Sequence, residues 1–208
     1  MQYPCYRCGA ILGAALCVLN TSGALFWNET SDGDLSNNQS TPNSFVLENG
    51  ANSVVGTVNA LTDFQDWLAV TISSGFQLSA VRLAAYISTD PIAFTGFQSG
   101  SSFVGSSFVE SSYLGYTHIG PGNVGSDLLP LMENAFGAQG FTAPLQAGTY
   151  TFVIQQAGSS LTSYQFDYEV TPVPEPRTQA AIALLCAAFF LSRKFLQTRS
   201  GRAGTIIQ

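Results

Sequence analysis

Apolar and polar residues alternate strictly from Ser163 to Val170 (SYQFDYEV), the pattern of a strand with one buried face. The segment GTYTFVIQ, residues 148–155, alternates in the same way and places Tyr150, Phe152 and Ile154 on one face. A loop of turn-forming residues, QAGSSLTS, joins the two segments. The pattern therefore predicts that they pair as an antiparallel hairpin.

A second hairpin is predicted from two apolar segments, Asp66 to Ile72 and Gln77 to Ile87, with SGF as the turn between them. One face of the later strand is expected to carry Val81, Leu83, Ala85 and Ile87. Shorter strands are expected in SFVL and SVVGTV. The segment DLLPLMENAF holds at most a short helical turn, which Pro130 is expected to break.

Several short strands separated by Gly, Ser and Asn predict an all-β fold. We expect an antiparallel, jelly-roll-like β-sandwich over residues 25–172, in a chain long enough to form one domain with a sizeable core. Both ends of the chain differ from this body in composition. They predict an N-terminal signal helix and a C-terminal transmembrane helix, which belong to residues 1–24 and 173–208.

The first 24 residues have the three parts of a signal peptide. Arg7 supplies a positive charge, and an apolar stretch follows from Cys8 to Leu19. Ser22 and Ala24 are small residues at the −3 and −1 positions of a cleavage before Leu25. We expect cleavage there and export of the chain. A buried N-terminal helix is the alternative, but the glycines of this segment and its lack of an amphipathic face disfavour it.

The C-terminal apolar run from Thr178 to Leu191 has 14 residues. As a helix it would reach about 21 Å, whereas a bilayer core needs about 30 Å. Pro174-Glu175-Pro176 precedes the run after Val173, and the basic pair Arg193-Lys194 follows it. The two prolines favour an extended, accessible motif.

This three-part arrangement resembles the PEP-CTERM sorting signal of exported bacterial proteins. The resemblance implies an exosortase-type processing enzyme as a partner, and transient anchoring in the inner membrane before release to the cell surface or beyond. A GPI signal would end in its apolar tail, whereas four basic residues follow the apolar run here. Two features depart from the family pattern: Arg177 directly follows the motif, and the chain continues to Gln208.

Parts of the body resemble the bacterial pre-peptidase C-terminal domain, a small β-sandwich of secreted proteins. The resemblance rests on NALTDFQDWLAVTISSGFQLSAVRLAAY, residues 59–86, and LQAGTYTFVIQQAGSSLTSYQFDYEV, residues 145–170. It implies a non-catalytic accessory domain. No protease domain precedes the body in this chain.

The charge of the body excludes nucleic acid as a partner. From Leu25 to Val173 there are 12 acidic residues and a single basic residue, Arg82. Such a surface repels phosphate backbones and anionic lipid at low salt. The four cysteines all lie at the two ends of the chain, so the body has no disulfide, no cysteine-ligated zinc and no cysteine nucleophile.

The best candidate site is a calcium site in NETSDGDLSNN, where Glu29, Asp32 and Asp34 lie close together in the sequence. Carboxylate and amide oxygens suit Ca²⁺. The spacing is not that of an EF-hand, and Asp63 and Asp66 form a second, weaker group. The alternative is a segment of Asx turns with solvated acids. Apart from this calcium, no cofactor is expected.

Catalysis is not expected. His118 is the only histidine, it lies in a segment expected to be a loop (residues 118–127), and no G-x-S-x-G sequence offers a serine nucleophile. A two-carboxylate glycosidase needs only two acids at the right distance, so a small secreted hydrolase stays open as an alternative.

The unit GSSFV-GSSFV-ESSYL, residues 100–114, repeats an aromatic residue every five positions: Phe103, Phe108 and Tyr113. In a strand these residues would alternate faces, so they form no one-sided platform. Either they plug the domain from a loop, or they present an exposed surface for extracellular polysaccharide. The function predicted is therefore an exported, non-catalytic surface or matrix protein, with a polysaccharide-binding or adhesive module as the alternative.

Overall fold

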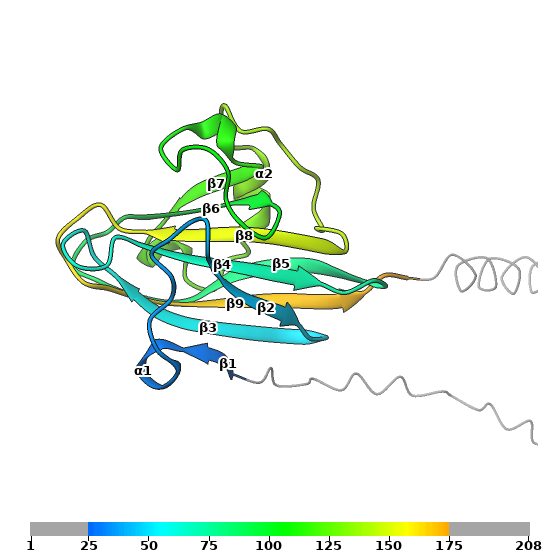
Figure 1. The fold of residues 1–208 in the computed structure, drawn as a ribbon, viewed down its shortest axis with the longest axis horizontal. Helices are drawn as coiled ribbons and strands as arrows, with labels where there is room; N and C mark the ends of the chain where they lie inside the picture. Colours follow the sequence, from blue (N-terminus) through cyan, green and yellow to red (C-terminus); the bar gives the residue numbers. More distant parts are fainter. Residues whose placement is uncertain (1–24, 175–208) are drawn as a thin grey trace, which may run out of the picture.

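Two β-sheets build the part of the chain that the computed structural model describes, residues 25–174 (Figure 1). The first sheet has the order β1-β3-β9-β5, with strands Leu25–Asn28, Gly50–Val58, Thr162–Pro172 and Phe76–Ile87. The second has the order β2-β4-β8-β6-β7, with strands Asn43–Leu47, Gln65–Ile72, Gly148–Gln155, Ala93–Ser99 and Gly115–Ile119. The all-β prediction is thus confirmed for this part of the chain.

Four short helical turns accompany the sheets: α1 (Glu29–Asp32), η1 (Glu110–Ser112), η2 (Pro121–Asn123) and α2 (Leu129–Glu133). Within residues 25–174, none of them has the length and apolar character needed to cross a membrane. The predicted signal peptide and apolar C-terminal run lie outside the described residues. The same holds for the predicted site residues Ser22, Ala24, Glu175, Pro176, Arg193 and Lys194.

The sheets are mixed rather than purely antiparallel, which corrects the prediction. β1 pairs with β3 in parallel, and β2 pairs with β4 in parallel. The other strand pairs are antiparallel. The chain crosses from one sheet to the other between β1 and β2 and again between β2 and β3. β1 and β2 therefore each lie at the edge of a sheet, where each runs parallel to its neighbouring strand.

The two predicted hairpins are wrong in their pairing, although their strands are right. β4 and β5 lie in different sheets, and so do β8 and β9. The strands instead exchange partners: β4 pairs with β8, and β5 pairs with β9. Alternation fixes which face of a strand is buried, but the hydrogen-bonding partner is set by the whole sheet.

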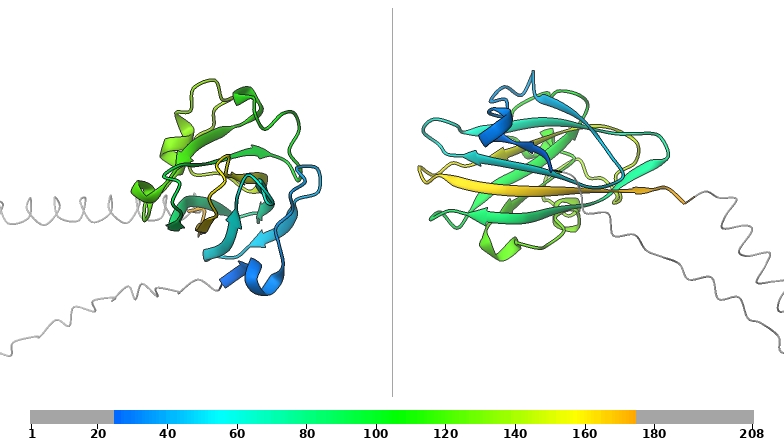
Figure 2. Two further views of the ribbon diagram at one scale, coloured as in Figure 1. Left: turned by 90° about the vertical axis from the view of Figure 1, so that its left-hand side faces the viewer. Right: turned by 90° about the horizontal axis from the view of Figure 1, so that it is seen from below.

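The space between the sheets is the main hydrophobic core (Figure 2). Leu83 and Phe166 of the first sheet and Leu68 and Phe152 of the second belong to one cluster of buried side chains. The rings of Phe152 and Tyr168 meet edge to face with centroids 5.3 Å apart. Burial of these large side chains is the dominant favourable term in folding.

The prediction of which residues of β5 share one buried face is partly wrong, because the pairing of this strand is irregular. Val81 and Leu83 are buried as expected, but the register shifts between Leu83 and Ala85, and Ile87 is 72% exposed. Tyr86 is buried in its place. A β-bulge inserts one residue and moves the residues after it to the opposite face.

Two further expectations are corrected locally. Pro130 lies in the first turn of α2 and so begins this helix instead of breaking it, because proline lacks only an N–H that the first turn leaves free. His118 lies within β7, in antiparallel register with Phe94 of β6, and not in a loop.

Candidate functional site: an acidic cluster beside the first strand

An acidic cluster, defined here as Glu29, Asp34, Asp63 and Asp66, gathers at the end of the domain where α1 lies (Figure 1). Glu29 opens α1, Asp34 follows that turn, Asp63 lies between β3 and β4, and Asp66 is the second residue of β4. One carboxylate oxygen from each of Glu29, Asp34 and Asp63 lies within 4.8 Å of the other two. The cluster thus joins acids from both of the groups recognised in the sequence.

Glu29 fastens the N-terminal segment to the first sheet. Its Oε2 accepts a hydrogen bond of 2.7 Å from the backbone N–H of Thr57 in β3, and its Oε1 accepts one of 3.2 Å from the N–H of Leu35. Asn28 caps α1 by accepting a hydrogen bond from the N–H of Thr30. The carboxylate of Glu29 is therefore held at a fixed place.

Asp63 is placed by a tight turn. The backbone groups of Asn59 and Asp63 exchange two hydrogen bonds, of 2.7 and 3.2 Å. The Oδ1 atom of Asp63 is buried and has no hydrogen-bond partner within the described residues. A buried acceptor without a partner is costly, so its place next to other carboxylates needs a physical reason.

Asp66 is the most deeply buried member, with 0% of its surface exposed. Its Oδ2 accepts a 2.6 Å hydrogen bond from the Tyr164 hydroxyl of β9, which crosses from one sheet to the other. Its Oδ1, like that of Asp63, is buried and has no hydrogen-bond partner among the described residues. Two orphaned carboxylate oxygens thus belong to one cluster.

Gly56 of β3 makes room for this arrangement. A β-carbon at this position would overlap the Tyr164 hydroxyl and lie 3.0 Å from the Glu29 carboxyl carbon. Both groups therefore lie close to the α-carbon of Gly56, where a side chain would displace them. Sequence reasoning missed Gly56 and Tyr164, because only the pairing of β3 with β9 brings them beside the acids.

Burial and mutual repulsion raise the pKa values of the acids. Burial, followed by the charge of Glu29, raises the pKa of Asp66 to about 10. Burial and the charge of Asp34 raise the pKa of Asp63 to about 6. The pKa of Glu29 is also raised, mainly by burial. No basic side chain within residues 25–174 forms an ion pair with the cluster.

Asp32 does not join the group, although the sequence prediction included it. Its Oδ2 accepts a 2.8 Å hydrogen bond from the N–H of Asn28, and its side chain is exposed. Asp32 thus follows the Asx-turn alternative, whereas Glu29 is partly buried and hydrogen-bonded to β3.

The aromatic repeat is divided between two environments. Phe103 and Tyr113 are buried against Trp67 and Val153 on the outer face of the second sheet, in a smaller core. Phe108 is 71% exposed. Two of the three aromatics therefore plug the domain, and one faces solvent.

The start of the predicted sorting motif is attached to the body. The N–H of Val173 donates a 2.8 Å hydrogen bond to the carbonyl of Gly75, next to the beginning of β5. Pro174 is the last described residue.

No family model matches the chain, and comparisons with the curated proteins and with the solved structures found no match. The ion that the acidic cluster can bind is therefore inferred from the spacing of its carboxylate oxygens. Ca²⁺ binds carboxylate oxygens at about 2.3–2.6 Å, so ligand atoms on opposite sides of one ion lie about 5 Å apart. Three oxygens that lie within 4.8 Å of one another fit one such ion.

Proposed function

We propose that this chain is an exported, non-catalytic module of the cell surface or extracellular matrix, built as a β-sandwich that is stabilised by calcium. The observation that carries the calcium part is the convergence of three carboxylates, those of Glu29, Asp34 and Asp63, with two orphaned oxygens on Asp63 and the neighbouring Asp66 and no basic partner among the described residues. Glu29, Asp34, Asp63 and the Oδ1 atom of Asp66 are the proposed ligands. Calcium would neutralise the acids and attach the N-terminal segment to β3 and β4.

The proposal of export and the proposal of calcium binding are consistent with each other, because calcium is abundant outside the cell. Extracellular calcium-binding modules have dissociation constants of the order of 10⁻⁴–10⁻³ M, which suit millimolar calcium outside the cell. A domain that carries one basic residue against 12 acids needs neutralising cations from its surroundings. The signal peptide over residues 1–24, the PEP-CTERM-like ending with its exosortase-type partner, and the transient membrane stage are parts of the same proposal.

Titration of the purified full-length chain with Ca²⁺ tests the site. Calcium at 10–100 times its dissociation constant should stabilise the fold by about 1–3 kcal/mol. The melting temperature should then rise by about 3–9 °C for a domain of this size. Asp63→Asn and Glu29→Gln should remove most of this rise, and Asp32→Asn is the matched control that should retain it. Absence of binding heat and of any melting shift at millimolar calcium would end the calcium proposal.

The sorting part has its own test in the native host. Glu175→Gln removes the charge of the motif, and replacing Pro174 and Pro176 with Ala removes the extended conformation. Both changes should leave unprocessed chain in the membrane fraction. If both variants fractionate like the wild type, and the wild type keeps residues 178–208, the apolar run is only an anchor.

A further inference from the structure

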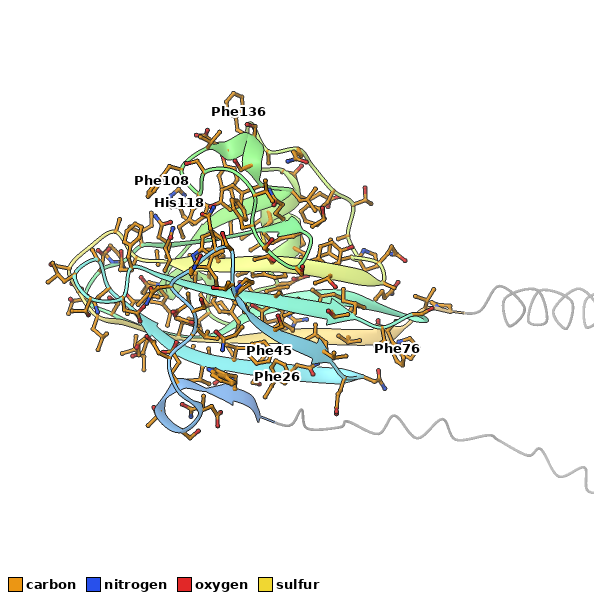
Figure 3. The ribbon with its side chains drawn as sticks, viewed as in Figure 1. Phe26, Phe45, Phe76, Phe108, His118 and Phe136 are labelled. Atoms are coloured by element: carbon orange, nitrogen blue, oxygen red, sulfur yellow. The ribbon has the colours of Figure 1, made fainter. Side chains whose placement is uncertain are left out.

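A pocket of about 600 Å³ opens on the second sheet, where the ends of β6, β7 and β8 meet the segment Ser107–Glu110. Its size is that of a small-molecule site. Figure 3 shows two of its residues, Phe108 and His118, on the same side of the domain, away from Phe26 and Phe45 beside β1 and β2. The pocket lining contains none of Glu29, Asp34, Asp63 and Asp66, so the inference drawn from it does not rest on calcium binding.

Aromatic rings form one wall of the pocket. Phe94 stacks on Tyr116 with ring centroids 5.6 Å apart and meets His118 edge to face at 5.8 Å. Phe108 closes the other side and stacks on Phe64 at 6.1 Å, so its ring is supported although it is 71% exposed. The wall therefore offers supported ring faces to a ligand.

The neutral hydrogen-bonding groups of the pocket are largely used within the protein. The Tyr113 hydroxyl donates to the Ser107 carbonyl, and the Tyr116 hydroxyl donates to the Phe136 carbonyl. The Gln156 amide donates to Ile92 and Thr162 and accepts from Gly158. Among the polar side chains of the lining, a ligand would therefore contact chiefly the carboxylates of Asp90 and Glu110 and the ring of His118.

The charge of the pocket is negative. Asp90 and Glu110 are both in the lining, and the lining contains no lysine or arginine. Arg82, the basic residue of the body, is engaged with Glu169 at 2.6 Å. Glu110 is exposed and forms no ion pair within the described part of the chain. Aromatic ring faces combined with carboxylates that have no ion-pair partner attract a cation whose charged group carries apolar substituents.

We propose that this pocket binds an organic ammonium cation, with Phe94, Phe108 and Tyr116 around the cationic group and Asp90 and Glu110 supplying the countercharge. An ammonium group with methyl or methylene substituents loses little hydration on entering and interacts with the ring faces. The acidic surface of the domain raises the local concentration of such a ligand.

Calorimetry on the full-length chain in saturating calcium tests the proposal with two probes of the same shape. Choline is the cation, and 3,3-dimethylbutan-1-ol is its neutral carbon analogue. Choline should bind at least 10-fold more tightly, because only the cation gains from the rings and the carboxylates. Equal affinity for the two probes, or no choline binding at 10 mM, would overturn the proposal.

Paired variants locate the site. Phe108→Ala should weaken choline binding by about 2- to 5-fold, the range expected for one exposed cation–π contact. Phe136→Ala, at a residue that is 92% exposed and outside the pocket lining, should leave binding unchanged. Glu110→Gln should also weaken binding, with the exposed Glu48→Gln as its control. Binding of neutral oligosaccharides that depends on Phe108, with no binding of choline, would assign the pocket to sugars and refute the cation.

Discussion

Two groups of acidic side chains in this domain differ in whether their carboxylates find partners within the chain. Near the middle of β5, Glu169 pairs with Arg82, Asp167 accepts a 2.6 Å hydrogen bond from Ser53, and Asp127 accepts one of 3.1 Å from the N–H of Val81. In the acidic cluster, Asp63 and Asp66 each keep a buried oxygen without a partner. The carboxylates of the first group are satisfied by donors within the chain, whereas the second group requires protons or a cation from outside. The predictions below test this difference.

The largest effect is expected from pH in the absence of calcium. The folded pKa of Asp66 is raised to about 10, above the unfolded value of 3.8, so the folded chain holds a proton that the unfolded chain has lost between these pH values. Stability should therefore fall as pH rises through this window, by about 1.4 kcal/mol per pH unit. Asp63 adds to the trend up to about pH 6.

Urea denaturation at pH 5 and pH 7 in a chelator measures this trend, and a loss of about 4 kcal/mol is expected over the two units. Saturating calcium should flatten the trend, because the ion replaces the protons. A chelated protein that is equally stable at both pH values would show that Asp66 holds no such proton.

The next effect concerns Gly56→Ala. The new methyl group would overlap the Tyr164 hydroxyl and press on the Glu29 carboxyl group. Overpacking of this kind costs about 1–3 kcal/mol, and we expect the upper part of that range. Gly122→Ala is the control, because nothing lies within 4 Å of its added β-carbon. Thermal melts with and without calcium should show lower stability and a weaker calcium response for Gly56→Ala, and neither change for Gly122→Ala. Equal melting temperatures for the two variants would contradict the described packing.

Tyr164→Phe should have a smaller effect. It removes the donor of the buried 2.6 Å hydrogen bond to Asp66, at an expected cost of about 1–2 kcal/mol. Calcium affinity should also fall, since Asp66 becomes harder to ionise. Tyr86→Phe removes a hydroxyl that donates to the Asp90 carbonyl, so it should lower stability without changing calcium affinity. Unchanged calorimetric affinity in Tyr164→Phe would separate Asp66 from the ion.

The smallest effect is expected from Arg82→Gln. The pair with Glu169 is partly exposed, with side-chain exposures of 41% and 35%, and pairs of this kind contribute less than about 1 kcal/mol. The calcium response should be unchanged, because Arg82 belongs to the other group of acids. A loss of calcium binding in this variant would mean that the two groups are coupled after all.

Local pattern in the sequence was sufficient for six of the nine described strands, all but β1, β6 and β7, and for part of the site. Alternation from Ser163 to Val170 lies within β9, and the acids of residues 28–38 supply two members of the cluster. A strand buries a face wherever a sheet covers it, so alternation is visible without knowledge of the partner. Glu29 and Asp34 are close in the sequence, so a single turn can bring them together.

The tertiary structure decided which strands pair, which acids meet and which aromatics face solvent. β4 and β5 follow each other in the sequence but enter different sheets, and this exchange of partners brings Asp66 to Tyr164 across the core. The spacing of Phe103, Phe108 and Tyr113 is regular, yet only Phe108 is exposed. Partner choice depends on contacts between residues far apart in the chain, and local periodicity carries no information about them.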